Sequence, residues 1–83
     1  MIDRSIISQV LSQAISLMAK GDSLSEEMFS IWFDYSCNML KLACSYDSLT
    51  PLYYMNFALN LRINGLSPIQ RLDACFNYLN SIT

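Results

Sequence analysis

The sequence predicts an all-α protein, a compact bundle of four helices joined by short connections. Three observations predict this fold. Apolar residues recur at helical spacing in four successive segments, helix-start or helix-stop residues separate these segments, and the connections between them are only a few residues long. A chain of 83 residues has room for one core, so we expect a single domain over residues 1–83.

The first helix is expected over residues 3–20. Ile7, Ala14 and Met18 fall on one stripe, whereas the opposite side carries only serine and glutamine. Gly21 follows, and glycine readily takes the left-handed conformation that ends a helix.

The second helix is expected over residues 25–45 and is predicted to be the central one. It is apolar nearly all round and has one narrow polar stripe, which is typical of a helix packed on several sides. Ser23 and Glu26 match a capping box near its start.

The third helix is expected over residues 51–64. Thr50 and Pro51 are a capping residue followed by a proline at the first helical position, and Gly65 ends the pattern.

The fourth helix is expected over residues 68–81, because Ser67 and Pro68 repeat the device that starts the third helix. Gln70 completes a possible capping box, and a clean apolar stripe follows.

Few charges are present: 14% of residues, against roughly 25% in an average globular domain. The five basic residues are scattered singly and the net charge is −2, so we expect no nucleic-acid partner. No apolar run approaches the roughly 18 residues of a membrane span. No segment has the composition of a signal peptide, and we expect a cytoplasmic protein that does not bind membranes.

Catalytic and metal-binding patterns are missing from the sequence. The chain has no histidine, and its three cysteines, Cys37, Cys44 and Cys75, are expected to be free thiols. We therefore expect neither an enzyme nor a bound metal or cofactor.

Two short segments resemble parts of known families. Residues 21–25, Gly-Asp-Ser-Leu-Ser, resemble the nucleophile block of the GDSL esterases, which implies Ser23 as nucleophile, but no histidine is present to activate it. Residues 47–49, Asp-Ser-Leu, resemble the phosphopantetheine site of acyl carrier proteins, which are acidic four-helix domains, and this implies modification of Ser48. The helix after Ser48 contains no acid, unlike the recognition helix of that family.

The predicted function is binding to another protein. Tyrosine is enriched at interfaces, and uncharged amides are cheaper to remove from water than Lys or Glu. Tyrosine and asparagine share one face of the expected third helix, and two residues of the second helix are added to this candidate site. The candidate partner-binding residues are Asp34, Tyr35, Tyr53, Asn56, Asn60 and Asn64.

Inhibitors, immunity proteins, anti-defence proteins and chaperones that occupy a partner's surface inside the cell all fit this description. A second hypothesis is a homo-oligomer, a homodimer for example, with a structural or assembly role. Its copies would meet through the serine and glutamine face of the first helix. An acyl-carrier-like domain is a remote third hypothesis.

Overall fold

The computed structural model describes residues 2–83, and it confirms the predicted all-α bundle of four helices. A short 3₁₀ turn, η1, precedes the second helix. The helix bounds lie within two residues of those expected from the sequence. The elements are α1 (Arg4–Met18), η1 (Gly21–Ser23), α2 (Glu26–Ala43), α3 (Thr50–Ile63) and α4 (Pro68–Ile82).

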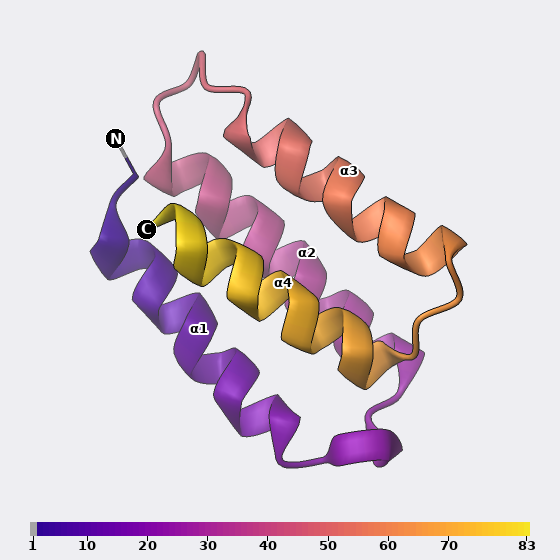
Figure 1. Cartoon of the computed structure of the whole chain (residues 1–83). Coiled ribbons are helices and arrows are strands. Elements are labelled where there is room, and N and C mark those ends of the chain that lie inside the picture. The colour runs from indigo at the N-terminus through magenta and orange to yellow at the C-terminus, as the bar shows by residue number, and fades with distance from the viewer. Residues whose placement is uncertain (1) are drawn as a thin grey trace.

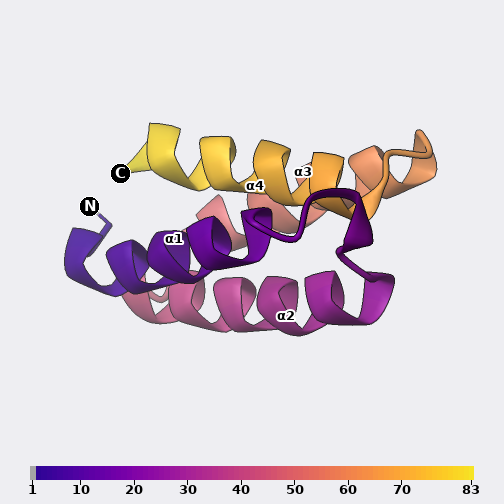
Figure 2. The same cartoon turned by 90° about the horizontal axis from the view of Figure 1, so that it is seen from below.

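Successive helices run antiparallel, so the chain alternates in direction from each helix to the next (Figure 1). Seen from below, α4 and α2 lie on opposite sides, with α1 in front between them and α3 behind (Figure 2). The two ends of the chain lie close together, and the Arg4 guanidinium donates a 3.1 Å hydrogen bond to the Thr83 carbonyl oxygen.

The centre of the bundle is shared by two helices. α2 contacts each of the other three, as expected for a central helix, and α4 also contacts all three. Side chains from every helix fill the core, and Leu40 of α2 and Leu72 and Leu79 of α4 are fully buried. Trp32 joins α2 to α1, because its indole N–H donates to the Val10 carbonyl oxygen at 3.2 Å.

The start of α2 differs from the expectation. The predicted capping box of Ser23 and Glu26 is wrong, because residues Gly21–Ser23 form the 3₁₀ turn and the Ser23 hydroxyl donates to the Lys20 carbonyl oxygen. Ser25 caps the helix instead by accepting a 3.1 Å hydrogen bond from the Met28 amide. Glu26 thereby remains free to bind a residue outside its own helix.

Both ends of the connection between α3 and α4 follow the sequence signals. After α3, Gly65 has a φ of 79°, its amide donates to Arg62, and the Leu66 amide donates to the Leu61 carbonyl oxygen. This is the Schellman arrangement, in which a left-handed residue closes a helix. α4 then begins with the predicted capping box. The Ser67 hydroxyl accepts a hydrogen bond from the Gln70 backbone amide, and the Gln70 side chain accepts one from the Ser67 backbone amide.

Candidate protein-binding surface

Exposed apolar side chains are concentrated in one part of the molecule. Among residues 2–83, ten large apolar side chains are exposed, and seven of them lie between residues 46 and 63. Such clustering distinguishes an interaction surface from the scattered apolar atoms that every protein exposes. The seven are Tyr46, Leu49, Leu52, Tyr53, Met55, Leu59 and Ile63.

Most of this surface is one side of α3. Leu52, Asn56, Leu59 and Ile63 follow one another at spacings of four, three and four residues and form a single line along the helix, which we call the α3 seam. Its apolar members are open to solvent: Leu52 and Leu59 are each 52% exposed and Ile63 is 71% exposed.

The opposite side of α3 holds the helix to the bundle. Tyr54 is fully buried, and its hydroxyl lies 2.7 Å from the Ser36 hydroxyl of α2. Ser36 donates its proton to the Phe33 carbonyl oxygen at 2.6 Å, so Tyr54 is the donor in the bond between the two side chains. Burial raises the pKa of Tyr54 well above its usual range, which keeps this donor protonated.

Aromatic contacts strengthen the same attachment. The ring of Tyr54 packs between Phe33 of α2 and Tyr78 of α4, with centroid separations of 5.4 and 5.6 Å. Phe57 of α3 also contacts Tyr78, at 4.7 Å. α3 is therefore fixed on its inner side, and its seam is presented on a rigid support.

A groove runs between α3 and α2. It consists of two depressions of about 450 and 330 Å³ that share Leu52 and Met55 as lining residues. Phe29, Phe33 and Ala58 line the second depression, so apolar side chains from both helices form much of this groove. We call it the α2–α3 groove.

Positive side chains mark the two ends of the α2–α3 groove. Lys41 lines the depression at the start of α3, and Arg62 lines the one near the end of α3. Arg71 also lines the second depression, but its side chain is buried. It forms an ion pair with Glu26, and its guanidinium lies 4.7 Å from the centre of the Phe29 ring. The burial of Arg71 was not predicted from the sequence, because Glu26 and Arg71 are 45 residues apart.

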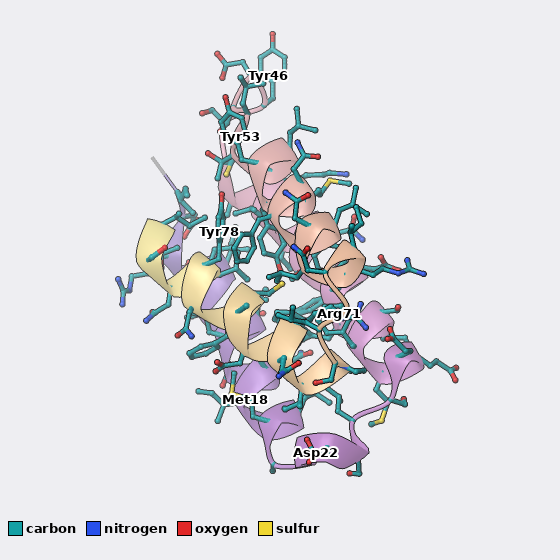
Figure 3. All side chains as sticks on the ribbon, turned by 45° about the vertical axis from the view of Figure 1, so that its right-hand side comes forward. Met18, Asp22, Tyr46, Tyr53, Arg71 and Tyr78 are labelled. Atoms are coloured by element: carbon teal, nitrogen blue, oxygen red, sulfur yellow. The ribbon has the colours of Figure 1, made fainter. Side chains whose placement is uncertain are left out.

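The predicted site residues divide into two groups. Tyr53, Asn56 and Asn60 are exposed on α3, and Asn64 is exposed directly after its last residue; Asn56 belongs to the α3 seam itself. Figure 3 shows Tyr53 on the outside of the bundle, next to the loop that carries Tyr46.

Asp34 and Tyr35 do not extend that surface. Asp34 is exposed on α2 but lines neither depression of the α2–α3 groove, and Tyr35 is half-buried on the side of α2 that faces α1.

The apolar members of the seam were not among the residues predicted from the sequence. The available signal was a second apolar line on the third helix, Leu52, Leu59 and Ile63, opposite the residues that enter the core.

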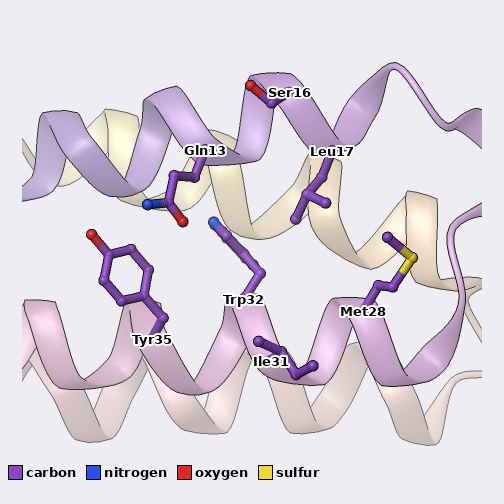
Figure 4. A pocket seen from close by; sticks show the side chains of 7 residues that line it. All are labelled: Gln13, Ser16, Leu17, Met28, Ile31, Trp32 and Tyr35. Atoms are coloured by element: carbon purple, nitrogen blue, oxygen red, sulfur yellow. The ribbon is translucent and has the colours of Figure 1, made fainter.

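Tyr35 contributes to a second groove, between α1 and α2. This groove has a volume of about 530 Å³, and none of its seven lining residues is charged. In Figure 4, Gln13, Ser16 and Leu17 border it from α1, while Ile31, Trp32 and the other α2 side chains border it from the opposite side.

The serines of the two family resemblances lie in turns. Ser23 belongs to η1, and the Ser48 hydroxyl accepts a 3.2 Å hydrogen bond from the Thr50 amide at the start of α3. Both side chains thus bond to backbone groups near a helix end, as capping serines do.

Cysteine and acidic residues do not gather into a ligand set. No group of three or more His, Cys, Asp or Glu side chains able to hold a metal ion occurs within residues 2–83. The three cysteines are free; Cys37 and Cys75 are buried and Cys44 is half-buried. In the same range, no helix is both long enough and apolar enough to cross a bilayer.

Comparison with protein-family models, with curated proteins and with solved structures finds no match to this chain.

Proposed function

We propose that this protein acts by binding a second protein through the outer side of α3, and that it works by occupying the surface of that partner. The observation that supports this proposal is the concentration of exposed apolar side chains between residues 46 and 63. An inhibitor, an immunity protein or a chaperone would each use a surface of this kind.

The chemistry of the surface favours association. Apolar side chains gain free energy when they leave water, by about 25 cal/mol for each Å² buried. The neighbouring polar groups, Asn56, Asn60 and the Tyr53 hydroxyl, are uncharged and are cheaper to desolvate than charged side chains. Arg62 is the single charged residue of α3.

The experiment that tests this proposal is recovery of the tagged chain from its native host, with bound proteins identified and quantified by mass spectrometry. We expect one heterologous protein in near-equal amount. The variants Tyr53→Glu and Asn60→Lys should lose it while keeping the helical circular dichroism of the parent. Asn80→Lys is the matched control, because Asn80 is an exposed asparagine on α4. Recovery of the bait alone, or variants that bind as the parent does, would contradict the proposal.

A homo-oligomer remains the second candidate, and the groove between α1 and α2 favours it. The groove is bordered by Gln13 and Ser16 of the serine and glutamine face, and all of its lining residues are uncharged, so two copies would meet there without charge repulsion. Light scattering over a wide range of protein concentration tests this candidate, and a strictly monomeric chain would exclude it.

A further inference from the structure

We propose that the partner contributes an amphipathic α-helix, which packs along the α3 seam and the α2–α3 groove and carries carboxylates facing Lys41 and Arg62. This inference rests on the proposed protein-binding function and names the chemistry of the partner at that surface. It is supported by the spacing of the seam, by the polar residue within it and by the charges at its ends.

The spacing of the seam matches the side of a second helix. Leu52, Asn56, Leu59 and Ile63 follow the alternation of four and three residues that lets two helices pack side by side. The eleven residue steps from Leu52 to Ile63 correspond to about 16 Å, or three helical turns. A third helix laid against two antiparallel helices is a common way to fill such a groove.

Asn56 specifies a polar position in the partner. It lies between Leu52 and Leu59, so a helix that covers the seam also buries its amide. A buried amide without hydrogen bonds destabilises a complex, and a single asparagine within an apolar seam sets the register of the two helices. The partner helix should therefore place an amide or hydroxyl side chain opposite Asn56, within an otherwise apolar stripe.

The ends of the surface are positive. Lys41 lies beside Leu52, since both line the same depression, and Arg62 follows Leu52 by ten residues. By the rise of an α-helix, Arg62 lies about 15 Å along α3 from Leu52, at whose end of the groove Lys41 lies. Because complementary charges guide register and association, the partner helix should carry acidic residues at both ends of the contact, about three turns apart.

The α3 helix of a second copy lacks this complementarity. If two copies packed antiparallel about the middle of the seam, Arg62 of one copy would lie level with Tyr53 of the other copy. Arg62 would then be near the Lys41 of that other copy, so two positive side chains would face each other. In a parallel pair, neither α3 could supply a carboxylate, because α3 contains no acidic residue. Charge thus favours a heterologous acidic helix over self-association at this surface.

The test is site-specific photo-crosslinking in the native host. Leu59 and, in a separate variant, Ile31 are replaced by p-benzoylphenylalanine; Leu59 is 52% exposed in the seam, and Ile31 is 65% exposed beside the α1–α2 groove. We expect position 59 to crosslink to one segment of another protein. Sequenced by mass spectrometry, that segment should show apolar residues at spacings of three and four, with acidic residues about three turns apart.

The remaining outcomes contradict the partner helix alone, the assignment of the binding surface to α3, or the binding of any partner protein. Crosslinking at position 59 to a second copy of the chain, or to a segment without that pattern, overturns the helix inference. A heterologous crosslink at position 31 alone overturns the inference and the assignment of the binding surface to α3, but it leaves the binding of a partner protein intact. No crosslink at either position removes both proposals.

The acidic character of the partner is tested by charge reversal. Lys41→Glu and Arg62→Glu, each introduced beside the crosslinker at position 59, should lower the crosslink yield by about tenfold, because like charges would then face each other. Lys20→Glu is the matched control, since Lys20 is exposed next to η1 and lines none of the grooves. Yields that fall equally in all three variants, or in none, contradict the assigned charges.

Discussion

α3 and α4 are consecutive helices of 14 and 15 residues, and each has a proline in its first turn, yet they present different surfaces to solvent. Every exposed residue of α4 is polar, whereas five of the eight exposed residues of α3 are apolar. The five are Leu52, Tyr53, Met55, Leu59 and Ile63.

This difference has a simple physical origin. α4 has one apolar stripe, which the chain itself covers, because α4 contacts all three other helices. α3 has apolar residues on two opposite sides, and a helix at the edge of a four-helix bundle can bury only one of them. The second side is left in solvent, and the following predictions test whether the two sides of α3 are as different as the structure indicates.

The largest contrast is expected between adjacent tyrosines. Tyr54→Ala removes a fully buried ring and the hydroxyl that donates to Ser36, so it should lower the free energy of unfolding by about 3–5 kcal/mol. Tyr53→Ala, on the outer side, should change it by less than about 0.5 kcal/mol. Urea unfolding followed by circular dichroism measures both, and similar losses in the two variants would refute the assignment of the two sides.

A leucine pair repeats the contrast between the two helices. Leu79 is fully buried on α4, and Leu79→Ala should lower the free energy of unfolding by about 2–5 kcal/mol. Leu59→Ala should leave it within about 0.5 kcal/mol of the parent, because Leu59 is largely in solvent in the free protein. Thermal unfolding of the two variants provides the measurement, and a marked loss of stability in Leu59→Ala would mean that the seam is part of the core.

Two buried cysteines, Cys37 on α2 and Cys75 on α4, should make the free energy of unfolding fall at alkaline pH. Burial raises the pKa of Cys37 from 9.0 to about 11 and that of Cys75 from 9.0 to about 12. Because both values are raised, the unfolded chain loses these protons first. The contribution of each thiol is complete below pH 9 and is lost as the pH rises from 9 toward 11 for Cys37 and 12 for Cys75.

At pH 10 the expected loss is about 1 kcal/mol for each thiol relative to neutral pH, because pH 10 lies about one unit above the pKa of the unfolded thiols. Urea unfolding between pH 7 and 10 measures the slope, and Cys75→Ala should make it shallower. An unchanged slope in Cys75→Ala would show that this thiol does not contribute to the pH dependence.

The smallest expected effect concerns the start of α4. Ser67→Ala removes the side chain that accepts a hydrogen bond from the Gln70 amide, and it should destabilise the protein by about 1 kcal/mol. Ser81→Ala, at an exposed position in the last turn of α4, is the control and should be nearly neutral. Equal effects on the thermal midpoint would indicate that the capping box does not stabilise the helix in solution.

The helices themselves follow from the sequence. The four segments were predicted within two residues of their observed bounds, and the capping box of Ser67 and Gln70 and the closing role of Gly65 were both predicted correctly. These features depend on groups within one or two turns of each other, so a local pattern is sufficient to predict them.

Contacts between distant residues could not be predicted in this way. Four of the six candidate residues are exposed on α3 or directly after it, but Tyr35 faces a separate groove and Asp34 lines neither depression of the α2–α3 groove. The side chain of Glu26 likewise binds Arg71, a partner 45 residues away that no local pattern indicates.

The sequence by itself determined the four helices, their ends and the presence of two apolar sides on α3, because helical period and capping act locally along the chain. Only the tertiary structure decided which of those sides enters the core. Tyr54 meets Ser36, Phe33 and Tyr78 from two other helices, and these contacts leave the line from Leu52 to Ile63 in solvent. The location of the proposed binding surface is therefore a consequence of packing between helices, which the periodicity of a single helix does not encode.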